Sequence, residues 1–221
     1  MRVMTALERV ETAASALKVF PLSSVVLFPG MAVPLHIFEA RYRELVKDSL
    51  ATNRVMAMSQ PAAGAARESV ARPALHPICC AGVIAWHEEL ADGRYNIIVR
   101  GVARARISEE LPARKEYREV RAEILGDPAF RGPEEEQLRQ TVFELAGLLP
   151  HGFGQNVLQN AASASGGSLA DAMAAALVID RERRQQLLSE LDVRRRLLGV
   201  VDEVGELIAR LTPRKDAGPV N

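Results

Sequence analysis

The residues best suited to metal chemistry gather between positions 76 and 87. His76 precedes the adjacent pair Cys79 and Cys80, and His87 follows further along. Two thiolates and two imidazoles could hold a zinc ion in tetrahedral geometry. Adjacent residues on a strand point to opposite faces, however, so the two thiols are expected to diverge. The sequence therefore favours buried structural cysteines over a metal centre.

A second candidate is an acid–base cluster made by His87, Glu88, Glu89 and Asp92. Such groups transfer protons when they converge on a substrate. Asp92-Gly93 is also a hairpin signal, and polar side chains are usual at the tip of a hairpin. The sequence thus favours a solvated turn over a catalytic site.

Other chemical motifs give little support to catalysis. The glycines of 152–154 and 166–167 do not follow a strand in a βαβ pattern. The chain has neither a G-x-x-x-x-G-K-[ST] loop nor a G-x-S-x-G elbow. Successive helical residues lie about 100° apart, so the arginines of 194–196 predict a solvated helix side. We expect no enzymatic activity, no metal and no cofactor.

Composition limits the class of protein. The chain has 221 residues, of which 48% are hydrophobic and 25% charged, with a net charge of zero. These values are typical of a soluble globular protein of one or two domains. The zero net charge argues against nucleic acid or an anionic membrane as the main partner. Two adjacent cysteines cannot build a disulfide framework, so we expect a cytoplasmic protein without a secretory leader.

Short apolar runs in the N-terminal half predict strands at 19–22, 25–28, 33–37, 55–59, 78–87, 94–100, 102–107 and 120–124. Pro29-Gly30 predicts a type II turn, and the pattern of 39–50 predicts one short helix. Pro21 indicates that the first strand is bulged or lies at an edge. Six or more short strands favour a closed or nearly closed β-barrel.

Helical signals dominate after residue 127. Pro133 begins a helix that extends to about Leu149, and Ser168 with Asp171 forms an S-x-x-D capping pattern. Asp180 and Asp192 are suited to cap the last two helices. The predicted fold class is α+β. Its expected parts are an N-terminal extension (1–16), a β-rich subdomain (17–126), a helical subdomain (127–212) and a flexible tail (213–221).

Three blocks of sequence, in order over residues 18–211, carry a family resemblance. The first block holds Phe20-Pro21-Leu22, Val25-Val26, Phe28-Pro29-Gly30, Pro34-Leu35 and Arg41-Tyr42. The second holds Gly82-Val83-Ile84, Asp92-Gly93-Arg94-Tyr95, Gly101-Val102, Arg104 and Ile107. The third holds Leu169-Ala170-Asp171, Ala174-Ala175, Asp192-Val193 and Arg196-Leu197. Together they resemble the LON substrate-binding domain, which is the N-terminal domain of Lon proteases.

The resemblance implies a PUA-like β pseudobarrel with one short helix, followed by a C-terminal α-helical bundle. It also implies a role in recognising and holding polypeptides. The ATPase and peptidase modules that follow this domain in Lon have no matching segment here. We therefore expect a stand-alone, non-proteolytic binder of unfolded or partner polypeptides, acting as an adaptor or chaperone-like protein beside a separate protease or chaperone system.

Apolar side chains left over once the core is filled would form the binding site. The candidates lie near the turn, the first helix and the hairpin: Met31, Ile37, Phe38, Tyr42, Trp86 and Tyr95. The alternative for each is that it packs inside the barrel. A contiguous exposed patch of several of them would favour binding. A partner strand added to an edge near Pro21 would supply backbone pairing.

Two rival functions remain open at this point. A PUA-like fold also suggests RNA binding, although fold alone does not imply function. A coherent arginine surface would support that alternative. An enzyme of another kind would need a deep pocket with convergent titratable groups.

Overall fold

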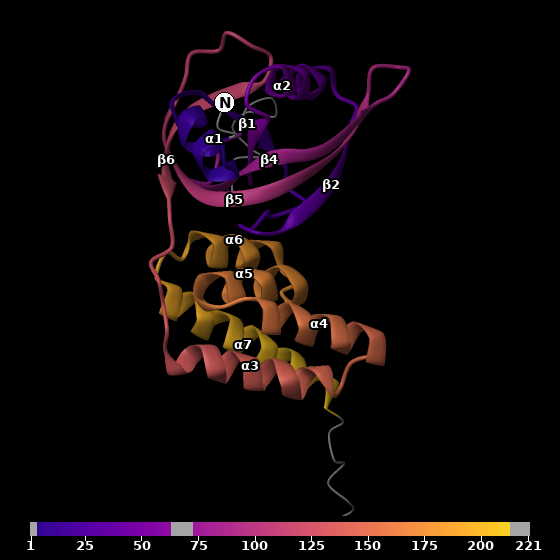
Figure 1. The fold of residues 1–221 in the computed structure, drawn as a ribbon, viewed down its shortest axis with the longest axis vertical. Coiled ribbons are helices and arrows are strands. Elements are labelled where there is room, and N and C mark those ends of the chain that lie inside the picture. The colour runs from indigo at the N-terminus through magenta and orange to yellow at the C-terminus, as the bar shows by residue number, and fades with distance from the viewer. Residues whose placement is uncertain (1–3, 63–72, 213–221) are drawn as a thin grey trace, which may run out of the picture. The chain divides into compact units, whose positions relative to one another are not determined.

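The computed structural model describes residues 4–62 and 73–212 and shows an α+β protein with a mixed sheet (Figure 1). The chain divides into two compact units. The first runs up to Pro128 and includes Asp180–Leu191; the second holds Ala129–Ile179 and the chain from Asp192 onward. The sequence led us to expect residues 180–191 in the helical subdomain, whereas they belong to the first unit. The expected tail, 213–221, lies outside the described residues.

All six described strands belong to one sheet in the first unit (Figure 1). They are β1 (Leu17–Pro21), β2 (Ala32–Ile37), β3 (Val55–Ser59), β4 (Ile78–Glu89), β5 (Tyr95–Glu110) and β6 (Arg118–Leu125). Their order is β2-β5-β4-β3-β1-β6, and β5 also pairs with β6. This last pairing closes five strands into a ring, while β2 is attached only through β5. The β1–β3 pair is parallel and the other pairs are antiparallel.

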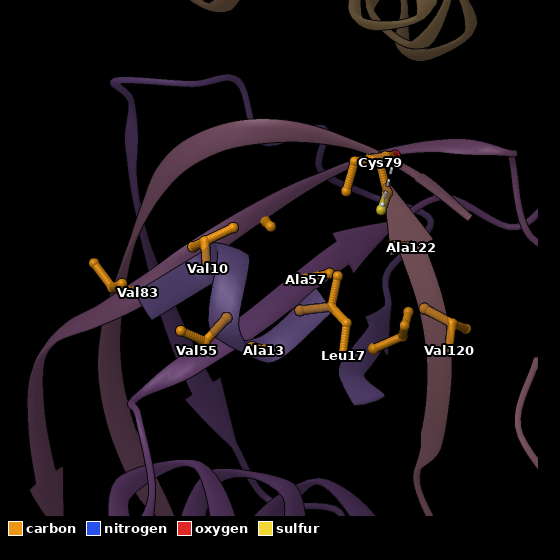
Figure 2. Close-up of a cluster of buried hydrophobic side chains, with 12 residues drawn as sticks. Val10, Ala13, Leu17, Val55, Ala57, Cys79, Val83, Val120 and Ala122 are labelled. Atoms are coloured by element: carbon orange, nitrogen blue, oxygen red, sulfur yellow. Dashed lines mark hydrogen bonds between the residues drawn. The ribbon is translucent and has the colours of Figure 1, made fainter. Parts of the chain in front are cut away.

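The ring is filled by side chains from alternate strand positions, as Figure 2 shows. Alternation follows from the strand itself, in which residues i and i+2 face the same side. The strand members of this cluster are Leu17, Val19, Val55, Ala57, Cys79, Ala81, Val83, Ala105, Val120 and Ala122. Helix α1 (Ala6–Ala13) adds Val10 and Ala13 to the same cluster. The stretch expected to be an N-terminal extension therefore contributes to the core.

Helix α1 begins with a reciprocal capping box. The backbone N–H of Glu8 donates to the Thr5 hydroxyl at 3.2 Å, and the Thr5 N–H donates to the Glu8 carboxylate at 2.7 Å. Two otherwise orphaned donors are satisfied in this way. A 3₁₀ turn, η1 (Ala14–Ala16), then leads directly into β1.

The expected second strand, 25–28, is not a strand. Val26, Leu27 and Phe28 are buried in a loop whose hydrogen bonds go to β5. The Gly30 N–H donates to the Gly101 carbonyl at 3.0 Å, and the Gly101 N–H donates to the Met31 carbonyl at 2.8 Å. The type II turn is confirmed, because Met31 N–H donates to the Phe28 carbonyl at 3.1 Å and Gly30 has φ of 81°.

The expectation for Pro21 is wrong. Strand β1 is enclosed between β3 and β6, so it is not an edge strand. Pro21 is tolerated because it is the last residue of β1, where the pairing with β6 has already ended at Val19. Its only strand neighbour there is Ser59 of β3. The strand with one partner is β2, which carries Pro34.

Two further helices belong to the first unit, α2 (Ala40–Ala51) and α6 (Arg181–Ser189). Asp180 caps α6 as predicted, accepting from the Arg183 N–H at 2.7 Å. The Gln185 amide donates to the Ile78 carbonyl at 2.9 Å, and Arg104 Nε donates to the Leu188 carbonyl at 2.8 Å. Because Ile78 and Arg104 lie on β4 and β5, these bonds attach α6 to the sheet.

The second unit holds α3 (Pro133–Ala146), α4 (His151–Ser163), α5 (Gly166–Leu177) and α7 (Val193–Leu211). The N-cap of α5 is Ser165, which exchanges bonds with Ser168, so the predicted S-x-x-D cap is wrong. Asp171 is instead buried, and its carboxylate lies 3.3 Å from Nε of the buried Arg196. Arg196 therefore departs from the solvated helix side expected for 194–196. No helix in the described ranges has the length and apolar character needed to cross a membrane.

Candidate binding face on the outer sheet

An apolar row crosses three strands on one exposed part of the sheet. Pro34 of β2 lies opposite Ile98 of β5, and Ile98 lies opposite Trp86 of β4. All three side chains are exposed, Ile98 at 36% and Trp86 at 48%. Directly opposed side chains on one sheet face are in contact range. The register therefore creates a continuous exposed apolar strip.

A polar row lies one register step along the same face. His36 of β2, Asn96 of β5 and Glu88 of β4 are directly opposed. His36 Nδ1 is 2.8 Å from Asn96 Oδ1, and Asn96 Nδ2 donates to Glu88 Oε2 at 2.9 Å. These side chains contact one another and border the apolar row.

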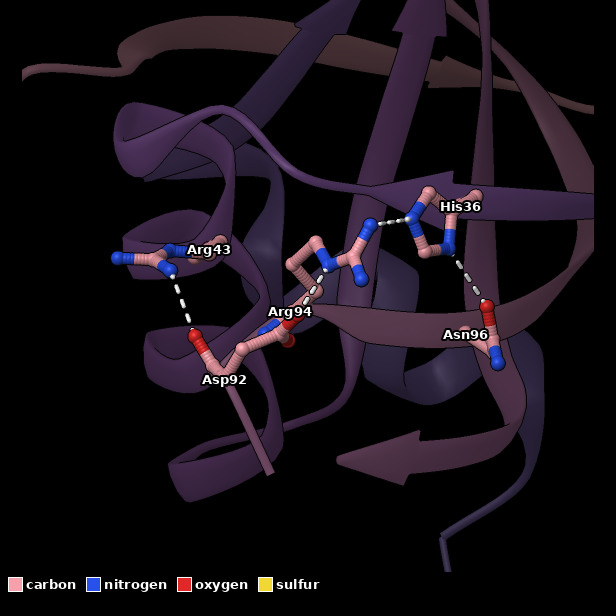
Figure 3. A network of polar contacts seen from close by, with 5 residues as sticks. All are labelled: His36, Arg43, Asp92, Arg94 and Asn96. Atoms are coloured by element: carbon pink, nitrogen blue, oxygen red, sulfur yellow. Dashed lines mark hydrogen bonds and ion pairs between the residues drawn. The ribbon is translucent and has the colours of Figure 1, made fainter. Parts of the chain in front are cut away.

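Arg94 completes this polar row at the end of the hairpin (Figure 3). Its Nη1 lies 3.2 Å from His36 Nε2. A guanidinium only donates and Asn96 Oδ1 only accepts, so the two contacts suit the His36 tautomer that carries its hydrogen on Nδ1. The imidazole is thus held in one orientation from both sides.

Phe38 lies beyond the end of β2, on the other side of His36 from Pro34. Its side chain is 63% exposed, and its ring stacks on His36 with centroids 6.3 Å apart and planes inclined by 26°. We call Pro34, Phe38, Trp86 and Ile98 the apolar face. Ile98 and Trp86 lie on strands of the closed ring, and β2 is paired with β5 along its whole length, so the backbone that carries Pro34, Ile98 and Trp86 is preformed.

The hairpin tip is tied to α2 rather than arranged for catalysis (Figure 3). Arg94 Nε lies 2.6 Å from Asp92 Oδ2, and Arg43 of α2 donates to the Asp92 carbonyl at 3.1 Å. The hydrogen bond from the Arg94 backbone N–H is the main cause that lowers the pKa of the Asp92 carboxyl. His87 and Glu88 alternate on β4, so they face opposite sides. The four acid–base candidates therefore do not all lie on one face of the sheet.

The six predicted binding residues separate into two groups. Ile37, Tyr42 and Tyr95 are buried, at 2%, 7% and 5% exposure, and belong to the core. Phe38 and Trp86 are on the surface, while Met31 is half-buried.

The buried three have identifiable partners. Ile37 and Tyr95 are paired across β2 and β5. Tyr42 packs edge-to-face on Phe20, with ring centroids 4.5 Å apart. Burial is the main cause that raises the pKa of both tyrosines. These three side chains pack in the interior, which was the alternative to a binding role.

Sequence reasoning missed Pro34 and Ile98. The alternation along 32–37 and 95–100 was a usable signal, because it places every second residue on one face. The register across strands was not available, since an irregularity between Ile84 and Trp86 shifts the β4–β5 pairing. Without that shift, Trp86 would not lie beside Ile98.

Both cysteines are free and buried. Cys79 lies in the ring core and its Sγ donates to the Ala105 carbonyl at 3.5 Å. Burial raises the pKa of the Cys79 thiol to about 12, so it stays protonated at neutral pH. In the part of the chain that the structure describes, no three His, Cys, Asp or Glu side chains come together as a metal ion would require.

The chain is similar to several Lon proteases over part of their length. It is 30% identical over 209 residues to the Lon protease of Paraburkholderia phytofirmans, covering 90% of this chain and 25% of that protein. It is 30% identical over 195 residues to the Lon protease of Roseiflexus castenholzii, covering 84% of this chain and 23% of that protein. The chain thus spans about a quarter of the length of these relatives.

Two solved structures share its fold. The N-terminal domain of the Mycobacterium avium complex Lon protease has a TM-score of 0.69 at 18% identity, covering 86% of this chain and 98% of that one. The Lon N-terminal domain protein from Xanthomonas campestris has a TM-score of 0.63 at 23% identity, covering 85% and 97%. At these identities the likeness concerns the fold.

The family model of the ATP-dependent protease La (LON) substrate-binding domain matches residues 16–204, which include every element from β1 through most of α7. The match covers the substrate-binding domain and neither the ATPase nor the peptidase part. The chain therefore belongs to the LON substrate-binding domain family.

Proposed function

We propose that this protein is a non-catalytic module that binds unfolded or partner polypeptides on the apolar face. The observation that carries the proposal is the exposed row of Pro34, Ile98 and Trp86, with Phe38 exposed on the other side of His36. Isolated exposed apolar residues need no explanation, but a contiguous strip bordered by polar groups is typical of an interaction site. Membership of a substrate-binding family supports the same conclusion.

The energetics of the apolar face suit weak and permissive binding. Covering the exposed half of Trp86 removes roughly 100 Å² from water, which is worth about 2 kcal/mol. Phe38 offers a similar gain. Bonds among His36, Asn96 and Glu88 meet part of the hydrogen-bonding demand of the polar row when the face is covered. Apolar contact without directional demands would accept many sequences.

Side-chain contact is favoured over strand addition. The edge expected near Pro21 does not exist, because β1 is enclosed on both sides. The remaining single-partner strand, β2, carries Pro34, whose ring nitrogen cannot donate a hydrogen bond. Proline on an edge strand blunts pairing with another chain. We therefore place the polypeptide across the strands.

We further infer that the first unit is a PUA-like pseudobarrel and that the remaining helices form the expected bundle. The closed ring of β5, β4, β3, β1 and β6 supports the first inference. A role as an adaptor or chaperone-like binder beside a separate protease or chaperone system, in the cytoplasm, is part of the same proposal. The apolar character of the face favours polypeptide over the RNA-binding alternative.

A capture experiment with a permanently unfolded polypeptide tests the proposal. Phe38→Ala and Trp86→Ala should each weaken retention by about tenfold, since each removes more than 1 kcal/mol of apolar contact. Phe143→Ala is the matched control, because Phe143 is 69% exposed but lies in the second unit. Thermal unfolding of all three variants checks that they remain folded. Equal retention by all of them would disprove this placement of the site.

A further inference from the structure

A second concave surface lies beside α1 and is lined by three arginines. It is a depression of about 420 Å³ that receives Arg9 from α1, Arg54 from the turn before β3 and Arg100 from β5. Its other lining residues are apolar: Met4, Ala6, Val83, Ile84 and Ala85. None of the described residues that line it carries a carboxylate. We call it the arginine depression.

These three arginines differ from the others on the same unit in their partners. Six other arginines of the first unit are within ion-pair distance of an acid: Arg41, Arg94, Arg104, Arg106, Arg118 and Arg121. Among the residues that the structure describes, the side chains of Arg9, Arg54 and Arg100 have neither an ion pair nor a hydrogen bond. Like charges that share one depression repel each other, and an anion would remove that repulsion.

The backbone of Arg54 strengthens this contrast. Arg54 has φ of 61°, which lies in the left-handed region where glycine is favoured. The conformation is held by two bonds: its N–H donates to the Ser49 carbonyl at 2.7 Å, and its carbonyl accepts from the Ile84 N–H at 2.8 Å. Stability alone would therefore favour glycine at this position, and the chain has a guanidinium there instead.

We propose that the arginine depression binds an oxyanion of the phosphate class. The planar guanidinium presents paired donors that match the oxygens of a phosphate, and it keeps its charge at any physiological pH. A depression open to solvent suits a small anion or a charged end group. Arg100 lies two residues after Ile98 on the same face of β5, so the site borders the apolar face.

The anion has two possible sources, either a free phosphate compound or the phosphorylated side chain of a polypeptide. Both present the same doubly charged group to the three arginines. Inorganic pyrophosphate is the probe for the first source, and a short phosphoserine peptide, compared with its unphosphorylated form, is the probe for the second. Anion binding is measured without an unfolded polypeptide, so its failure and the failure of the polypeptide-binding proposal are distinguishable.

Calorimetric titration of the whole chain with each probe tests the site. Saturable binding is expected, and Arg100→Gln and Arg54→Gly should each weaken it by about tenfold, the usual effect of losing one charge-assisted contact. Arg106→Gln removes the same charge from an exposed ion pair with Glu123 and should leave the affinity unchanged. Arg54→Gly should also unfold at the same or a higher temperature than the wild type, because glycine tolerates its backbone.

Three results would overturn the proposal. The first is the absence of saturable binding of both pyrophosphate and the phosphoserine peptide. The second is an equal loss of affinity in Arg106→Gln, which would indicate general charge attraction. The third is unchanged affinity in both Arg100→Gln and Arg54→Gly. Binding of only one probe supports the site and identifies the source of the anion.

Discussion

The hydrogen bond between Tyr117 and Asp48 shows what a single residue contributes to this structure. The Tyr117 hydroxyl donates to Asp48 Oδ2 at 2.7 Å and so connects the segment before β6 to α2. Lys115 Nζ lies 3.0 Å from the same carboxylate. The hydrogen bond from Tyr117 is the largest cause that lowers the pKa of Asp48, and burial is the largest that raises the pKa of Tyr117. The bond is therefore stronger when Asp48 is ionised.

Tyr117→Phe should lower the free energy of unfolding by about 1 kcal/mol at neutral pH. Because the folded pKa of Asp48 lies below its ordinary value of 3.8, this contribution is complete above 3.8 and is lost as the pH falls through the folded value. The difference between wild type and variant should therefore shrink in acid. Urea unfolding over a series of pH values measures it. In an Asp48→Asn background, Tyr117→Phe should show no such pH dependence, and a pH-independent difference in the wild-type background would contradict this assignment.

The individual residues of the candidate site could be predicted only in part. Phe38 and Trp86 were identifiable as large apolar residues beside turn signals, and both are exposed. Ile37 and Tyr95 have the same character, yet they face inward. Residue type does not distinguish these cases, because the inward face of a strand is decided by its neighbours in the sheet. Pro34 and Ile98 were missed for the same reason.

At the level of helices and strands, turn and capping residues correctly predicted features that depend only on neighbouring residues. Asp92-Gly93 predicted the hairpin between β4 and β5, and Asp180 predicted the start of α6. Strand β3 has the predicted bounds, 55–59. The segment 25–28 has a strand-like composition, but its backbone bonds to β5 through the turn that follows, and no strand forms. The place of Pro21 in the sheet could not be predicted, because it depends on the pairing of β1 with β3 and β6, which are far away in the sequence.

The loop that replaces this strand depends on the glycine at position 101. A Cβ atom there would lie 2.2 Å from the Phe28 carbonyl oxygen, which belongs to the backbone of the loop. Gly101→Ala should therefore displace the loop and cost roughly 1–3 kcal/mol of stability. Gly30→Ala is the control: a Cβ there meets nothing within 4 Å, and the positive φ alone costs about 1 kcal/mol. Denaturant unfolding should rank Gly101→Ala as the more damaging change, and the reverse order would be inconsistent with this packing.

For the whole molecule, the apolar face and the arginine depression both lie in the first unit. Each surface is therefore formed by residues of the first unit alone. The buried pair of Asp171 and Arg196 lies in the second unit, and removing one member should lower its stability by about 3–5 kcal/mol, because a buried charge is left uncompensated. The chain has the fold of a substrate-binding domain and presents a preformed apolar surface on it.

The most direct measurement uses Trp86, which is the only tryptophan of the chain and belongs to the apolar face. Titration with a permanently unfolded polypeptide should shift its fluorescence emission to shorter wavelength in a saturable manner, because binding removes the indole from water. Phe38→Ala should require about tenfold more polypeptide for the same shift, and Phe143→Ala should behave as the wild type. An unchanged emission while an independent assay records bound polypeptide would contradict the central claim that this face is the binding site.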